Sequence, residues 1–152
     1  MPQIFHQIMV KAPAARAFEA LTTQSHFKGW WTDDVAVEPT VGSVARFGFG
    51  GGAVIFEMRI EELTAPQQIR WTCLKGPDEW IGTDLTWTFT PAAGGATDGA
   101  TIIRLRHDGF RSMSRDFPRT NTTWGHLMHY LKKYLETNAV DPFFRRDRPM
   151  DF

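Results

Sequence analysis

The sequence predicts an α+β fold in which a curved antiparallel sheet of six to seven strands wraps around one long C-terminal helix. Apolar and polar residues alternate over most of the stretch between Val35 and His107, as they do in strands with one buried face. The segment Asn121–Thr137 instead has apolar residues at helical spacing. Because the apolar face of a sheet must be covered, and only this helix is long enough to cover it, we expect the two to pack together.

A strand and two short helices are predicted before the main sheet. Gln3–Val10 has β-favouring residues at period two. Pro13 suits the first turn of a helix, which we predict over Ala14–Leu21. Ser25 is the expected N-cap of a second short helix that ends near Gly29.

Two adjacent tryptophans, Trp30 and Trp31, follow this second helix. Tryptophan is a large side chain with one polar N–H group, so its burial is costly unless its surroundings suit it. We predict that Gly29 acts as a hinge and that the two rings have different roles. One is expected to pack in the core, and the other to face a cavity or a partner.

Six further strands are predicted from the alternation of apolar and polar residues. They cover Val35–Val37, Ser43–Phe49, Val54–Leu63, Gln68–Leu74, Thr83–Thr90 and Thr101–His107. The Ala- and Gly-rich segment Pro91–Gly99 is expected to be a hairpin loop. A polar loop then leads to the final helix, whose apolar stripe has six members: Trp124, Leu127, Met128, Leu131, Tyr134 and Leu135.

Composition and charge exclude several classes of function. Lys plus Arg and Asp plus Glu both number 17, so we expect neither a nucleic-acid partner nor an acidic membrane partner. No apolar run approaches the roughly 20 residues that span a bilayer, and the start lacks the pattern of a secretory signal. The single cysteine, Cys73, fits a reducing compartment. We expect a cytoplasmic protein with one domain over residues 1–152, a core over about 4–137 and a C-terminal tail over 138–152.

Three segments of the chain resemble a known family. They are VKAPAARAFEALTTQSHFKGWW, then LTWTFTP followed by a Gly-rich hairpin and TIIRLRHDGF, and finally TTWGHLMHYLKKYLE. Their order and spacing are similar to those of the activators of the ninety-kilodalton heat-shock chaperone's ATPase, in particular the bacterial single-domain homologues. These belong to the START-related, birch-pollen-allergen-like (SRPBCC) superfamily. The resemblance runs from Ile4 to about Glu136 and implies a helix-grip fold with an apolar cavity between sheet and helix, but no single chemistry.

The space between a curved sheet and its covering helix is the expected ligand site, because concave apolar spaces are the usual binding sites for small molecules. Its predicted wall consists of residues that face inward from the sheet and the helix, with one histidine as a polar anchor. They are Trp30, Trp31, Phe47, Phe56, Met58, Trp71, Leu85, Trp87, His107, Trp124 and Met128. Core packing without any ligand is the alternative reading for each of them.

The sequence predicts no catalytic residue, no metal site and no cofactor. His126 and His129 are spaced i, i+3 on the polar side of the final helix, but no third ligand accompanies them. Cys73 shares a strand face with Trp71, so we expect it to be a small buried hydrophobic residue. The glycines between Gly48 and Gly52 lie between strands, so a dinucleotide-binding loop is not expected.

Three hypotheses about function follow. The leading one is a non-catalytic module that binds a small hydrophobic or aromatic molecule in the cavity. The second is a protein-interaction module similar to the chaperone ATPase activators, with a chaperone as its partner. The third is a cavity enzyme of cyclase, dehydratase or hydrolase type, with His107 or His6 as acid and base. The sequence leaves open whether the protein is a monomer or a homodimer, and whether the tail folds back or joins a dimer interface.

Overall fold

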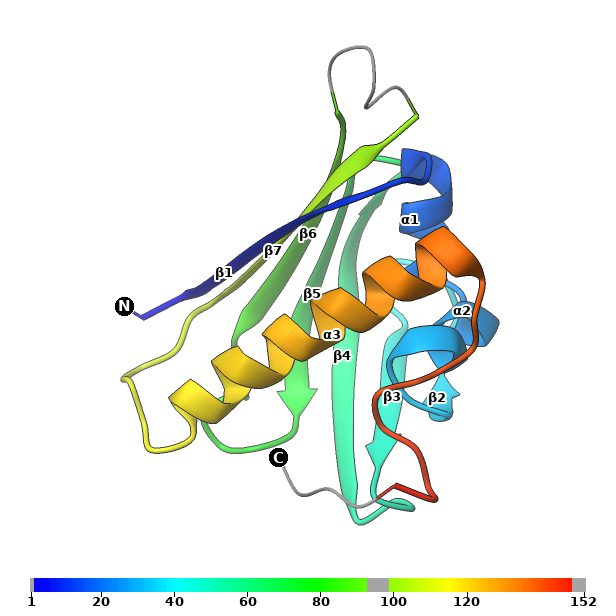
Figure 1. The fold of residues 1–152 in the computed structure, drawn as a ribbon. Coiled ribbons are helices and arrows are strands. Elements are labelled where there is room, and N and C mark those ends of the chain that lie inside the picture. The colour runs from blue at the N-terminus through cyan, green and yellow to red at the C-terminus, as the bar shows by residue number, and fades with distance from the viewer. Residues whose placement is uncertain (1, 93–98, 149–152) are drawn as a thin grey trace.

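A computed structural model describes residues 2–92 and 99–148 and shows a curved antiparallel sheet that holds a long C-terminal helix on its concave side (Figure 1). The elements are β1 (Ile4–Val10), α1 (Ala14–Ala20), α2 (Gln24–Trp30), β2 (Asp34–Ala36), β3 (Val44–Phe49), β4 (Val54–Thr64), β5 (Gln68–Lys75), β6 (Asp84–Pro91), β7 (Thr101–Asp108) and α3 (Phe117–Thr137). The predicted helix-grip fold is confirmed, with seven strands. Most of the loop expected over Pro91–Gly99, namely residues 93–98, lies outside the described residues.

The strand order is β1-β7-β6-β5-β4-β3-β2, and every neighbouring pair is antiparallel. The first two strands in the chain therefore form the two edges of the sheet. The helices α1 and α2 connect these edges across one end of the sheet (Figure 1). This connection brings the end of α2, with its two tryptophans, underneath α3.

Local irregularity in β4 bends the sheet. The pairing of β4 with β5 shifts register between Glu57 and Met58 and again between Ile60 and Glu62. Such bulges increase the local twist of a strand and curve the sheet. Over the first six residues of β5 and of β6 the side chains alternate between half-buried and buried positions, so one face of the sheet carries the core.

The helix α3 begins at Phe117, four residues before the predicted start at Asn121. Pro118 occupies the first turn, where its missing N–H costs nothing, and Phe117 is buried. The residues from Arg119 to Thr123 are polar, so the apolar spacing that predicts the helix is absent from its start. The helix ends at Asn138, which adopts the left-handed conformation with φ 61°. No helix in the described part of the chain is long and apolar enough to cross a membrane.

The helix α2 also differs from the prediction at its start. Its N-cap is Thr23, not Ser25, because Thr23 is extended and its carbonyl accepts hydrogen bonds from the N–H groups of His26 and Phe27. Gly29 lies inside the helix and is not a hinge. A Cβ atom at this position would lie 2.2 Å from Cε1 of Tyr134, so the missing side chain lets α2 approach α3 closely.

The C-terminal tail folds back onto its own chain. The N–H groups of Asp141, Phe143 and Phe144 donate to the carbonyl groups of Gly29, Trp30 and Trp31 over 3.0, 3.0 and 2.8 Å. The last carbonyl groups of a helix have no partner within the helix, so the tail satisfies the end of α2.

We predict that Gly29→Ala destabilises the protein by about 1–2 kcal/mol. Overpacking costs about 1–3 kcal/mol, and alanine's better helix propensity returns up to about 1 kcal/mol. The free energy of unfolding from urea titrations measures the loss.

Gly125→Ala is the matched control, because its added Cβ would meet only Cε1 of His6 at 3.6 Å, an ordinary contact. We expect this variant to be stabilised by up to about 1 kcal/mol. Equal effects of the two substitutions would contradict the proposed role of Gly29.

Candidate functional site

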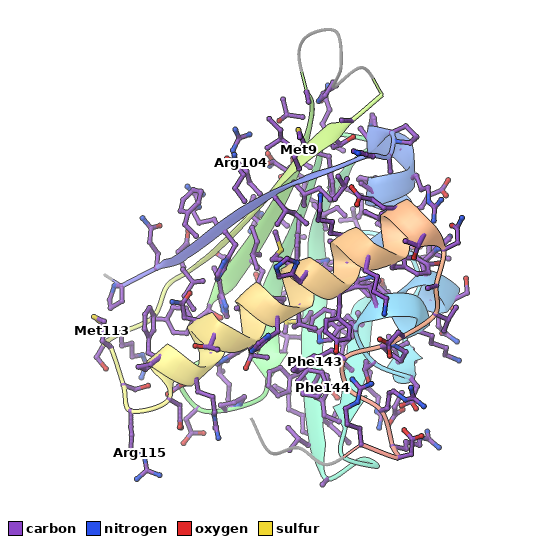
Figure 2. All side chains as sticks on the ribbon, in the orientation of Figure 1. Met9, Arg104, Met113, Arg115, Phe143 and Phe144 are labelled. Atoms are coloured by element: carbon purple, nitrogen blue, oxygen red, sulfur yellow. The ribbon has the colours of Figure 1, made fainter. Side chains whose placement is uncertain are left out.

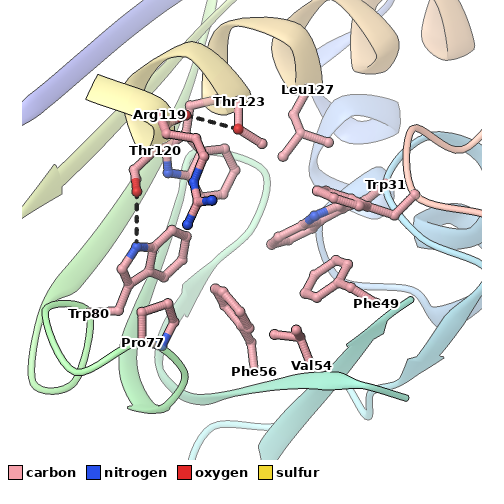
Figure 3. A pocket seen from close by; sticks show the side chains of 12 residues that line it. Trp31, Phe49, Val54, Phe56, Pro77, Trp80, Arg119, Thr120, Thr123 and Leu127 are labelled. Atoms are coloured by element: carbon pink, nitrogen blue, oxygen red, sulfur yellow. Dashed lines mark hydrogen bonds between the residues drawn. The ribbon is translucent and has the colours of Figure 1, made fainter. Parts of the chain in front are cut away.

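A cavity of about 290 Å³ opens between the N-terminal half of α3, the β3–β4 hairpin, the β5–β6 loop and the C-terminal tail (Figure 3). Aromatic side chains dominate its wall. The lining residues are Trp31, Phe49, Val54, Phe56, Pro77, Trp80, Arg119, Thr120, Thr123, Trp124, Leu127 and Phe144. Its volume is at the lower end of the range for ligand pockets, roughly 300–1,000 Å³.

The position of α3 explains why the space lies at this end of the sheet. The helix is tied to β1, since His6 Nε2 and Asn121 Oδ1 lie 3.0 Å apart and Lys132 donates to the carbonyl of Met9. It therefore covers the β1 side of the concave face most closely. The β3–β4 end is covered by the tail instead, through Phe144, whose ring centroid lies 4.5 Å from that of Phe49.

The walls present both edges and faces of aromatic rings. Phe56 meets Phe49 at 83° and Trp80 at 80°, with ring centroids 5.2 and 4.7 Å apart. Trp80 in turn stacks on Trp124 at 21°. Because edge-to-face and offset-stacked arrangements are the favourable ones for aromatic pairs, this lining suits a flat apolar group.

Few polar groups belong to the residues that line the cavity. Nε1 of Trp31 is buried and has no hydrogen-bond partner among the described residues. Thr120 Oγ1 accepts from Nε1 of Trp80 over 3.4 Å, and the Thr123 hydroxyl donates to the carbonyl of Arg119 over 2.9 Å. No lining residue in the described part of the chain is acidic.

Three of the predicted wall residues line this cavity: Trp31, Phe56 and Trp124. The other eight lie in the packed core beside it, each at most 2% exposed: Trp30, Phe47, Met58, Trp71, Leu85, Trp87, His107 and Met128. The centre of the concave face is filled by their rings, with Trp71 and Trp87 centroids 5.9 Å apart. The two tryptophans at the end of α2 thus have different surroundings, since Nε1 of Trp30 donates to the carbonyl of Ala20 over 3.0 Å.

Nine lining residues were not predicted. They are Phe49, Val54, Pro77, Trp80, Arg119, Thr120, Thr123, Leu127 and Phe144. Thr120, Thr123 and Leu127 are spaced with Trp124 along one side of α3. Thr123 and Leu127 lie within the predicted helix, and the earlier start adds Thr120 to it. Trp80 lies in a loop and Phe144 in the tail. In such segments the sequence has no periodic pattern that predicts whether a side chain points inward.

His107 is a structural residue behind the wall and does not line the cavity. Its Nδ1 accepts from Nε1 of Trp124 over 3.2 Å, so its Nε2 carries the proton and donates to the Thr83 hydroxyl over 2.8 Å. Burial lowers the pKa of His107 from 6.5 to about 3. The imidazole is therefore neutral at pH 7 with both nitrogens engaged.

Neither His6 nor Cys73 supports catalysis in the cavity. His6 does not line it, and its Nε2 is engaged with Asn121. Burial raises the pKa of the Cys73 thiol to about 11, so the thiol stays protonated and is a poor nucleophile.

We predict that His107 makes the protein less stable in mild acid. The unfolded chain binds a proton at this residue near pH 6.5, while the folded protein binds it only near pH 3. The contribution of the neutral His107 side chain to the free energy of unfolding is therefore complete above pH 6.5. It is lost as the pH falls toward 3. Between pH 7 and pH 5 the loss is about 2 kcal/mol, measured as the change in the free energy of unfolding.

His107→Gln should lose about 2 kcal/mol less between these two pH values, because glutamine does not titrate. His129→Gln, at an exposed position on α3, should behave like the wild type. A His107 imidazole carbon signal that titrates with a midpoint near pH 6 in the folded wild type would refute the assignment even if the variant does not fold.

Comparison with known proteins identifies the family. The family model described as "Activator of Hsp90 ATPase homolog 1-like protein" matches residues 11–136. No curated protein matches the sequence. Among solved structures, the Aha1 dimer from Colwellia psychrerythraea is 28% identical, with a TM-score of 0.80 over 90% of this chain and 98% of that one.

Two more distant structures share the fold. Protein SSP2350 from Staphylococcus saprophyticus is 18% identical, with a TM-score of 0.76 over 95% of this chain and 99% of that one. DynU16, from the dynemicin biosynthetic locus, is 22% identical, with a TM-score of 0.74 over 95% of this chain and 51% of that one. Because the family model spans most of its length, the chain belongs to the family of activator of Hsp90 ATPase homolog 1-like proteins.

Proposed function

We propose that this protein binds a small hydrophobic or aromatic molecule in the cavity under the N-terminal half of α3. The observation that carries the proposal is the aromatic cavity of about 290 Å³. An apolar occupant gains roughly 25 cal/mol for each Å² of apolar surface that it removes from water.

The cavity alone supports the proposal, because the unpartnered Nε1 atom of Trp31 is buried in the packing and is not exposed to an occupant. Nε1 of Trp87 is also buried without a partner among the described residues, yet Trp87 does not line the cavity. Its ring packs near-perpendicular to those of Trp30 and Trp124. An orphaned indole N–H is thus not evidence for a ligand.

The proposed binding residues are therefore revised from the sequence-based set. Trp31, Phe56 and Trp124 remain, and Trp80 and Phe144 join them. Because Phe144 belongs to the tail, the tail supplies one wall of the proposed site and holds it closed over the β3–β4 end of the sheet.

We predict that naphthalene-2-carboxamide, a small two-ring probe, raises the midpoint of thermal unfolding. A ligand at 100 times its dissociation constant adds about 2.7 kcal/mol to the folded state. For a chain of this size this corresponds to a shift of roughly 5–10 °C.

Thr123→Phe should abolish the shift, because the new ring would fill the cavity from α3. Thr122→Phe is the matched control, since Thr122 is exposed and does not line the cavity, and it should keep the full shift. The proposal is wrong if the probe leaves the wild-type midpoint unchanged, or if the shift survives in Thr123→Phe.

We propose, as a second candidate, that the protein interacts with a chaperone ATPase of the Hsp90 type and acts in the cytoplasm. The family match and the 28% identity to the Aha1 dimer favour this candidate, and the latter also favours a homodimer. The surface offers a suitable patch on the outer face of the sheet, where Phe5 is 58% exposed beside Arg70, Arg104 and Arg106. Figure 2 shows Arg104 extending away from the core.

We predict that the purified protein raises the rate of ATP hydrolysis by such a chaperone. Arg104→Glu combined with Arg106→Glu should weaken the stimulation at least tenfold, because charge reversal opposes an acidic partner. Thr123→Phe should leave the stimulation unchanged, since it alters only the cavity. No stimulation at saturating protein would remove this candidate.

A further inference from the structure

We infer that the occupant of the cavity is an aromatic acid, whose carboxylate is bound by Arg119 at the cavity mouth. This inference rests on the proposed ligand-binding function and names the chemical class of the ligand. It follows from the charge and the free donors of Arg119 and from the aromatic wall.

Arg119 is the one charged residue among those that line the cavity in the described part of the chain. Its side chain is 62% exposed, so it belongs to the mouth rather than to the floor. Figure 3 shows its guanidinium group reaching from α3 over the cavity, on the side of Trp80 and across from Trp31. A cation in this place can bind an anionic group while the rest of the ligand lies below it.

The guanidinium group keeps most of its binding capacity. Its ion pair with Asp116 joins Nη2 to Oδ1 over 3.4 Å, and both side chains are largely exposed. Arginine has five N–H donors, and exposed ion pairs of this kind are weak. A carboxylate can therefore form a two-pronged pair with the remaining donors.

The charge of Arg119, and not the threonines of the wall, selects an acid over an amine. Thr120 Oγ1 already accepts from Trp80, so the proton of its hydroxyl is left for another acceptor. Thr123 gives its proton to the carbonyl of Arg119, so its oxygen can still accept, and the two threonines suit an acid or an amine. The guanidinium charge makes the distinction, because it attracts a carboxylate and repels an ammonium group.

The shape and the lining define the rest of the ligand. Phe56, Trp80 and Trp124 line the cavity, and Figure 3 shows Phe56 and Trp80 below Arg119. One or two flat rings match both this surface and a volume of about 290 Å³. The first turn of α3, which carries Arg119, adds the partial positive charge of a helix start to the mouth.

The test compares two probes of nearly equal shape, naphthalene-2-carboxylate and naphthalene-2-carboxamide, by isothermal titration calorimetry at pH 7. We expect the wild type to bind the carboxylate about tenfold more tightly than the amide. Arg119→Gln should remove this preference and leave the affinity for the amide unchanged. The preference should also shrink between 0.05 and 0.5 M salt, because the pair at the mouth is open to solvent.

Arg115→Gln is the matched control. Arg115 lies four residues earlier, is exposed and does not line the cavity, and Figure 2 shows its side chain extending into solvent. This variant loses the same charge and should keep the tenfold preference. Equal binding of both probes by the wild type, or an equal loss for both in Arg119→Gln, would overturn the inference and leave the proposed function standing. If neither probe binds, both fail.

Discussion

The packing of Trp31 against Phe47 joins the sheet, α3 and the tail, three of the parts that wall the cavity. The two rings stack with their centroids 4.4 Å apart, and this contact holds the end of α2 against β3. Trp31 also binds the tail, because its backbone carbonyl accepts a hydrogen bond from the N–H of Phe144. Its ring also packs against Trp124 on α3, with centroids 5.4 Å apart. One side chain and its carbonyl thus join the sheet, two helices and the tail.

The buried polar groups around this residue fall into two kinds. The indoles of Trp30 and Trp124 and the imidazole of His107 are all paired, each with a partner in a fixed place. Such pairing is the general rule, because an unpaired buried donor costs about 1–3 kcal/mol. Nε1 of Trp31 and Nε1 of Trp87 depart from the rule. Because Trp87 does not line the cavity, the case for a ligand rests on the cavity and not on an unpaired donor.

The fold could be predicted from the sequence to a large extent, because its strands alternate cleanly and its last helix has one apolar stripe. The errors lie where this periodicity stops. The first turn of α3 is polar except for Phe117, and Gly29 looks like a hinge until its contact with Tyr134 is known. The candidate site was less predictable for the same reason. Trp80 and Phe144 come from a loop and from the tail, whose places depend on tertiary contacts. For inward-facing residues such as Trp71 and Trp87, the sequence pattern does not distinguish a place in the packed core from a place on the cavity wall. Both lie in the core.

The central claim is that the space beside Trp31 holds a ligand. The most direct measurement follows the six indole N–H signals of the tryptophans by nuclear magnetic resonance during a titration with naphthalene-2-carboxylate. We expect the signals of Trp31, Trp80 and Trp124 to shift in a saturable way, since these rings line the cavity. The signal of Trp30, which is bonded to Ala20 in the core, should stay in place. Signals that do not move, or that all move by the same amount, would contradict the account.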